Sequence, residues 1–231
     1  MKSSMSTPFL DQLDAATKLD DVGIFVIEQF LSEDAAANAF ETLNSDEDFP
    51  WELKPRLYRQ QLNQHAYEYK RSNSNIKKSN QSNSNGMSKL EELSKKVELQ
   101  FDGRVKYVYC NRFQDPNHNI PYHTDTFGQH IIVLSLGSQR TVNFRNKKTK
   151  QVTGLRPKAG DTYFFPLKVN DTHEHCVCAA KEEDLVDDKD NTRLSFVFFI
   201  EPPKYAKEYK ISRKDKLKGF AEAILSGESL F

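Results

Sequence analysis

Six short runs rich in β-branched and aromatic residues dominate the second half of this 231-residue chain. They are separated by Gly, Pro, Asn and Asp, and they cover residues 105–113, 130–136, 141–145, 161–165, 175–179 and 193–200. Runs of this length and spacing predict antiparallel β-structure, whereas a βαβ array would need helical patterns between successive strands. The sequence therefore predicts a mainly β chain of the α+β class, built as a two-sheet jelly roll.

The N-terminal part adds a strand and helices to this core. Residues 22–30 (VGIFVIEQF) have the composition of a strand, and Ser32 can cap a helix that runs to about Leu43. A second helix is predicted where Ser88 and Glu91 form a capping box ahead of a regularly spaced apolar face. We expect these N-terminal helices to flank the jelly roll.

Two segments differ from the core in amino-acid composition. Residues 72–85 contain five Ser and five Asn, too little apolar surface to offset the entropy of ordering, which predicts a mobile loop. The tail 202–231 is rich in Lys and then apolar, which predicts a helix packed on the outside. We expect one domain over 1–231, divided into N-terminal support (1–49), a substrate lid (50–100), a catalytic core (101–201) and the helical tail (202–231).

The composition limits the class of protein. Lys plus Arg and Asp plus Glu each number 33, so the net charge is zero, which argues against binding polyanions through bulk positive charge. The sequence contains neither an apolar run of about 20 residues nor a secretion signal at its start. Its three cysteines, Cys110, Cys176 and Cys178, are best read as reduced thiols. We expect a soluble intracellular monomer, cytoplasmic or nuclear, without a membrane partner.

A candidate metal site begins at His123-Thr124-Asp125, with His173 and His175 about fifty residues later. In a strand, residues two apart point to the same face, so His123 and Asp125 could chelate one ion together. A third ligand would come from a neighbouring strand, and strand parity leaves both His173 and His175 open. Two imidazoles and one carboxylate leave three octahedral positions free, an arrangement that suits non-haem Fe(II).

A candidate anion site lies at Arg193-Leu194-Ser195, where the most apolar run of the chain begins (RLSFVFFI). An arginine that opens a buried strand needs an anion. Because Arg193 and Ser195 share one strand face, they could together hold the carboxylate of a 2-oxo acid whose other end chelates the metal.

Across residues 50–200 the sequence resembles the AlkB-like branch of the Fe(II)/2-oxoglutarate dioxygenases. The matching segments are Pro55-Arg56, Tyr67-Glu68-Tyr69, Asn111-Arg112-Phe113 and LSLGSQRTVNFR at 134–145. The resemblance implies a double-stranded β-helix core, iron on His123, Asp125 and a second histidine, and 2-oxoglutarate on Arg193 with help from Ser195 and Asn111. The family's spacing between that histidine and the arginine fits His175.

The chain also departs from the family pattern at polar positions. Phe113 stands where the family usually has a tyrosine that touches 2-oxoglutarate, and Phe199 stands where it usually has a second arginine. Gln64 replaces a glycine expected before Tyr67. We therefore expect a cosubstrate pocket that depends mainly on Arg193, and a substrate side that differs from the nucleic-acid repair enzymes.

The cofactors implied are Fe(II), 2-oxoglutarate and dioxygen, and the reaction is oxidation of a substrate C–H bond. The leading prediction is AlkB-like oxidative dealkylation of a nucleobase, with substrate contacts from Arg56, Tyr67, Tyr69, Arg140 and Arg145. The alternative is a small-molecule oxygenase that hydroxylates or cyclises an amino-acid-like metabolite or natural-product intermediate. A protein side chain as substrate, or a catalytically inactive binding module, are further possibilities.

Overall fold

The computed structural model describes residues 17–19, 22–57, 60–70, 84–125, 130–185 and 191–201. These residues belong to one compact unit, Met1–Glu201. The helix predicted for 202–231 and most of the predicted loop 72–85 lie outside the described residues.

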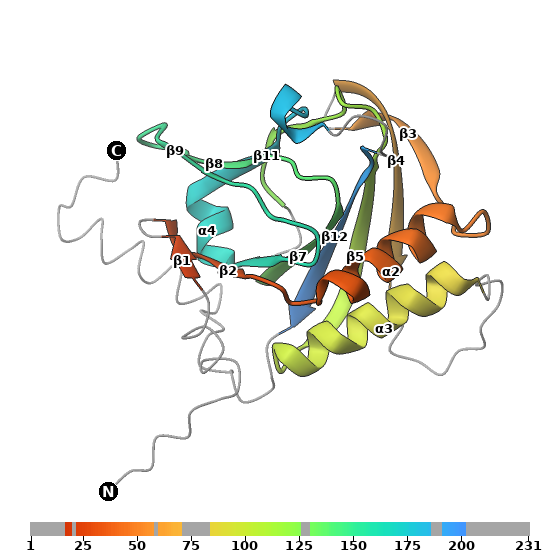
Figure 1. Cartoon of the computed structure of the whole chain (residues 1–231). Helices are drawn as coiled ribbons and strands as arrows, with labels where there is room; N and C mark the ends of the chain where they lie inside the picture. Colours follow the sequence, from red (N-terminus) through yellow and green to blue (C-terminus); the bar gives the residue numbers. More distant parts are fainter. Residues whose placement is uncertain are drawn as a thin grey trace, which may run out of the picture. The chain divides into compact units, whose positions relative to one another are not determined.

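The larger of two sheets has eight strands, and every pair of neighbours is antiparallel (Figure 1). Its order is β1-β2-β10-β7-β12-β5-β4-β3. The strands are β1 (Thr17–Leu19), β2 (Ile24–Ile27), β3 (Glu52–Leu57), β4 (Gln60–Lys70), β5 (Arg104–Phe113), β7 (His130–Gly137), β10 (Thr162–Phe165) and β12 (Arg193–Glu201).

The smaller sheet has the order β6-β11-β8-β9 and is also antiparallel. Its strands are β6 (Ile120–His123), β8 (Val142–Asn146), β9 (Val152–Leu155) and β11 (His173–Val177). All six runs predicted from the second half of the sequence are strands, in β5, β7, β8, β10, β11 and β12. The prediction of a mainly β, antiparallel fold is confirmed.

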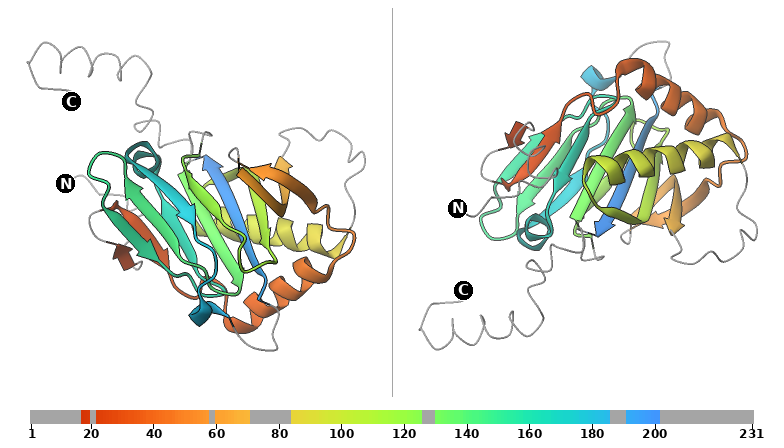
Figure 2. Two further views of the ribbon diagram at one scale, coloured as in Figure 1. Left: turned by 90° about the horizontal axis from the view of Figure 1, so that it is seen from above. Right: turned by 90° about the horizontal axis from the view of Figure 1, so that it is seen from below.

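Two helices, α2 (Glu33–Ser45) and α3 (Asn85–Gln100), lie across one face of the eight-stranded sheet (Figure 2). Ser32 caps α2 as predicted, because its hydroxyl accepts a hydrogen bond from the amide of Ala35 at 3.4 Å. A short helix, α4 (Leu167–Thr172), connects β10 to β11, and a 3-10 turn, η2 (Glu182–Asp184), follows β11. Within the described ranges, no helix is both long and apolar enough to cross a membrane.

Helix α3 starts one turn earlier than the capping box predicts. Ser84, rather than Ser88, is the N-cap, and its hydroxyl accepts a hydrogen bond from the Met87 amide at 3.2 Å. The amide of Gly86 also donates to the Asp46 carboxylate at 2.6 Å. Because Asp46 ends α2, a contact between the two helices fixes where α3 begins, and this contact is invisible in the local sequence.

Strands β3 and β4 were missed in the segment predicted to be a lid. Pro55 argues against a central strand, but β3 lies at the edge of the sheet, where a missing amide donor is tolerated. Strand β4 is poor in β-branched residues and is held by pairing with β5 from His65 to Lys70. Tertiary pairing therefore overrides weak local propensity in both strands.

The large sheet separates two hydrophobic clusters, one against the helices and one between the sheets. Strand β12 shows the division clearly, because Leu194, Phe196, Phe198 and Ile200 belong to the helix-side cluster, while Phe199 belongs to the cluster between the sheets. Arg193 and Ser195 have the same parity as Phe199. The alternation therefore turns these two polar residues inward, between the sheets.

Candidate active site

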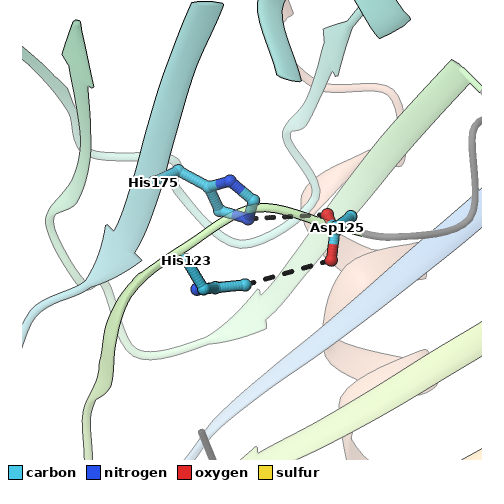
Figure 3. Close-up of side chains that lie close together, drawn as sticks. All are labelled: His123, Asp125 and His175. Carbon is cyan, nitrogen blue, oxygen red and sulfur yellow. Dashed lines mark ion pairs between the residues drawn. The ribbon is translucent and has the colours of Figure 1, made fainter. Parts of the chain in front are cut away.

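Three potential metal ligands meet at the edge of the smaller sheet. His123 ends β6 and lies directly opposite His175 of β11, with ring centroids 4.2 Å apart. Asp125 follows β6, with carboxylate oxygens 3.9 Å from Nε2 of His123 and 3.6 Å from Nε2 of His175 (Figure 3). One ligand atom from each residue lies within 4.8 Å of the other two, so the three could hold one metal ion.

The protonation states of these groups fit a cation. Nδ1 of His123 lies 2.8 Å from the carbonyl oxygen of Pro121, an arrangement that assigns the ring proton to Nδ1 and leaves Nε2 as a lone-pair donor. Burial lowers the pKa of both His123 and His175, which favours neutral imidazoles, the form that binds metals.

Asp125 itself lacks a partner that would satisfy its charge. Burial raises the pKa of Asp125 to about 6, and its Oδ2 atom accepts no hydrogen bond although it is buried. Neutral imidazoles beside it cannot supply a positive charge. A divalent ion between the three side chains would satisfy this carboxylate, so the donor set fits Fe(II).

Strand alternation, which the spacing of His123 and Asp125 suggested, does not account for the position of Asp125. Strand β6 ends at His123, and Asp125 lies in the segment beyond it. The side chain of Asn170 in α4 fixes this segment by accepting from the Asp125 amide at 3.0 Å and donating to its carbonyl oxygen at 2.6 Å. Sequence reasoning missed Asn170, since 45 residues separate the two and no motif links them.

His173 lies outside the ligand cluster. Its Nδ1 is 2.8 Å from the Thr172 hydroxyl, and its Nε2 is 3.4 Å from the side-chain amide of Asn146. His175, favoured by the family's spacing, is the histidine that lies with His123 and Asp125.

Arg193 is buried without enough partners for its charge. Its side chain is 0% exposed, and Nη2 donates to the hydroxyl of Ser135 at 2.8 Å. The other two guanidinium nitrogens, Nε and Nη1, have no hydrogen-bond partner. Burial lowers the pKa of Arg193, and the Phe113 ring lies 5.4 Å below its guanidinium carbon. A buried cation with two unpartnered nitrogens fits a site for an anion such as a carboxylate.

Ser195 and Asn111, the other predicted cosubstrate residues, lie beside each other on this inward face. Ser195 pairs with Asn111 of β5 and with Ser135 of β7, and all three residues are buried. The hydroxyl that contacts Arg193 is that of Ser135, which the sequence analysis did not single out although it lies in the LSLG segment.

The residues predicted to contact substrate do not converge on this site. Tyr67 pairs with Cys110 and therefore faces the helices, where its ring meets Phe49 edge-on at 5.4 Å. The parity of β4 turns Tyr67 away from the space between the sheets, so its position does not support the predicted substrate contact. The side chains of Arg56 and Tyr69 lie outside the described part of the structure.

Arg140 has a different role from the one predicted. It is 0% exposed and donates to the carbonyl oxygens of Pro116 at 2.7 Å and Asp115 at 3.1 Å. Its guanidinium therefore holds the loop after β5.

Arg145 lies on the opposite face of the smaller sheet from the ligand cluster, so its position does not support the predicted substrate contact. Its Nε donates to Glu174 at 2.7 Å, and its guanidinium carbon lies 3.7 Å from the centre of the Tyr122 ring. The preceding residue, Phe144, stacks on His175 at 5.6 Å. Adjacent strand residues point to opposite faces, so Arg145 points away from the site.

Comparison with known proteins supports the fold. No protein-family model matches the chain, and no curated protein matches it either. Among solved structures, the one described as "The structure of OsALKBH1" matches with a TM-score of 0.57 and 12% sequence identity, over 78% of this chain and 97% of that chain. At this identity the likeness concerns the fold alone, and the chain has a distant AlkB-like fold made of antiparallel sheets.

Proposed function

We propose that this protein is an Fe(II)/2-oxoglutarate-dependent dioxygenase that oxidises a C–H bond of its substrate, on a double-stranded β-helix core. The observation that carries the proposal is the combination, between the same two sheets, of a His123-Asp125-His175 cluster and a buried Arg193 with two unpartnered nitrogens. A metal site alone would fit many proteins. A cation site and an anion site together fit a chelating 2-oxo acid.

The residues of the chain would have separate tasks in this reaction. His123, Asp125 and His175 would hold Fe(II) and leave adjacent coordination positions open, while Arg193 would bind the distal carboxylate of 2-oxoglutarate. When bound, iron and 2-oxoglutarate supply oxidative decarboxylation by dioxygen and the oxidation of a nearby C–H bond. Asn170 would keep Asp125 in position, and the apolar walls formed by Phe144 and Phe165 against His175 would exclude water.

The first test is binding of the cosubstrate under anaerobic conditions. Fe(II) and 2-oxoglutarate together should give the weak visible charge-transfer band of a chelated 2-oxo acid, and His123→Ala should abolish it. His173→Ala is a matched control, because His173 lies two residues from His175 yet outside the cluster. A band of equal strength in His123→Ala and the parent would refute the metal assignment.

For the substrate, the sequence favours a nucleobase and the positions of the side chains favour a small molecule. The AlkB-like fold supports the nucleobase, but Tyr67, Arg140 and Arg145 are turned away from the site or bound to backbone. In addition, Lys147 donates to the carbonyl oxygens of Asn170 and Asp171 at the end of α4. Few cationic side chains among the described residues near the site are thus left to bind phosphates.

The face of the large sheet next to Asn111 carries acidic groups. Glu68 pairs with Tyr109, two residues from Asn111, and both Glu68 and Glu52 are exposed. Burial raises the pKa of Tyr109 to about 12, and the nearby carboxylates of Glu68 and Glu52 contribute to this rise. Carboxylates at this position would repel phosphates, which favours an uncharged or amine-bearing small molecule as the second candidate.

Succinate release tests the two substrate classes in parallel. If a methylated single-stranded oligonucleotide is the substrate, its binding should weaken steeply with salt. A plot of log K against log[salt] should then fall with a slope of about 0.7 for each phosphate contact. Turnover of amino-acid-like metabolites, with a shallow salt dependence, would support the small-molecule oxygenase. No succinate above the uncoupled background with either panel would count against both.

A further inference from the structure

One hydroxyl that the AlkB-like pattern would supply to 2-oxoglutarate is absent from this chain. Phe113 stands at that position, and its ring packs under the guanidinium groups of both Arg193 and Arg140, at 5.4 and 5.9 Å. Phe113 is completely buried and has no polar atom to offer. Arg193 keeps two unpartnered nitrogens that could bind a carboxylate. Because Phe113 cannot donate a hydrogen bond, any further donor to that carboxylate must come from elsewhere in the fold.

Tyr163, in the middle of β10, lies on the inward face of the same sheet. It pairs with Val133 of β7, two residues from Ser135, and strand parity therefore turns Tyr163, Val133 and Ser135 to one side. Tyr163 is 3% exposed and belongs to the hydrophobic cluster between the sheets. None of the motifs in the sequence draws attention to it.

The ring of Tyr163 connects the two halves of the site. It stacks on Phe165 and meets Phe144 edge-on, each at 6.3 Å between ring centroids. Phe165 and Phe144 in turn contact the ring of His175, at 5.2 and 5.6 Å. Tyr163 is thus part of the wall that extends from the metal ligands toward Arg193.

The hydroxyl of Tyr163 lies beside the charged end of Arg193. It adjoins the Arg193 guanidinium closely enough to interact with it, and it also interacts electrostatically with Asp125. Burial raises the pKa of Tyr163 to about 12, so the phenol is neutral at physiological pH and keeps its proton for donation. A neutral phenol beside a guanidinium is a suitable second donor to a carboxylate.

We propose that Tyr163 is a 2-oxoglutarate-binding residue, whose hydroxyl donates to the distal carboxylate beside Arg193 and Ser135 and so supplies the contact that Phe113 cannot make. This inference rests on the proposed function, since it concerns the cosubstrate of that site. It assigns the carboxylate site to three strands, with Arg193 from β12, Ser135 from β7 and Tyr163 from β10.

The test compares two ligands that differ only in the distal carboxylate. The protein is loaded with Mn(II), which resists oxidation, and calorimetry measures binding of 2-oxoglutarate and of 2-oxopentanoate, which lacks that carboxylate. Tyr163→Phe should weaken 2-oxoglutarate about tenfold or more, because a hydrogen bond to a charged group is lost. It should leave Mn(II) affinity and the weaker affinity for 2-oxopentanoate within about twofold of the parent.

A matched control is Tyr122→Phe, which removes a hydroxyl on the opposite face of the smaller sheet, where Tyr122 packs under Arg145. It should change neither affinity. An unchanged affinity of Tyr163→Phe for 2-oxoglutarate would overturn the inference, and so would an equal loss for both ligands, which would indicate general damage to the pocket. If the Mn(II)-loaded parent bound no 2-oxoglutarate, the proposed function itself would fail, an outcome distinct from either result.

Discussion

Replacing Arg193 with methionine should stabilise the ligand-free protein while removing its response to 2-oxoglutarate. The guanidinium is 0% exposed, its Nη2 donates to Ser135 and the Tyr163 hydroxyl lies beside it, while Nε and Nη1 make no hydrogen bond. Desolvating a poorly paired ion costs several kcal/mol, against about 1.5–3 kcal/mol for one charge-assisted hydrogen bond. Methionine is unbranched and uncharged, and it replaces the aliphatic stem of the arginine. We therefore expect the free energy of unfolding to rise by about 1 kcal/mol or more.

The effect on ligand binding should have the opposite sign. If the carboxylate of 2-oxoglutarate accepts hydrogen bonds from the two unpartnered nitrogens, the variant loses two charge-assisted hydrogen bonds to the ligand. This loss costs roughly 3–6 kcal/mol of binding free energy, a factor of about 10²–10⁴ in affinity. At a concentration of 100 times its Kd, 2-oxoglutarate should stabilise the Mn(II)-loaded parent by about 2.7 kcal/mol. Arg193→Met should show less than about 0.5 kcal/mol at the same concentration.

Urea unfolding with and without 2-oxoglutarate measures both quantities. Arg156→Met is the matched control, because Arg156 is partly exposed and forms ion pairs with Glu183 and Asp184, away from the site. It should lose a little stability and keep the full response to 2-oxoglutarate. The reasoning is refuted if Arg193→Met is clearly destabilised without ligand, or if it is still stabilised by 2-oxoglutarate as strongly as the parent.

Three further predictions concern the metal ligands, their support and a buried histidine. Asp125→Ala should lower Mn(II) affinity at least a hundredfold in calorimetry, and an unchanged affinity would remove Asp125 from the site. Asn170→Ala, which frees the Asp125 backbone, should weaken Mn(II) binding about tenfold, whereas Asn143→Ala, whose amide donates to Cys178, should leave it unchanged. Burial lowers the pKa of His130 from 6.5, so the folded chain holds it neutral while the unfolded chain is protonated below that pH. Unfolding then takes up a proton, and stability should fall as the pH drops below about 6.5. His130→Phe should flatten this dependence in urea unfolding measured from pH 5 to 8, and an identical slope in parent and variant would exclude His130 as its source.

The sequence by itself determined the strand content of the core and the main chemistry-bearing residues. The nearly continuous apolar run over 194–200 predicts a strand buried on both faces, and an arginine at its start favours an anion site. The pattern His123-x-Asp125 and the family's spacing to His175 and Arg193 identified the residues that the fold brings together. These features are local or depend on regular spacing, which is why they can be read without coordinates.

The sequence could not identify residues whose role depends on strand order or on contacts across the fold. Tyr67 and Arg145 carry suitable side chains, but the pairing of their strands turns one to the helices and the other to the outer face. The roles of Asn170, Ser135 and Tyr163 cannot be read from the sequence, because each acts on a partner more than 25 residues away. Only the tertiary structure decides such contacts, since a shift of one residue in strand register exchanges the two faces of a sheet.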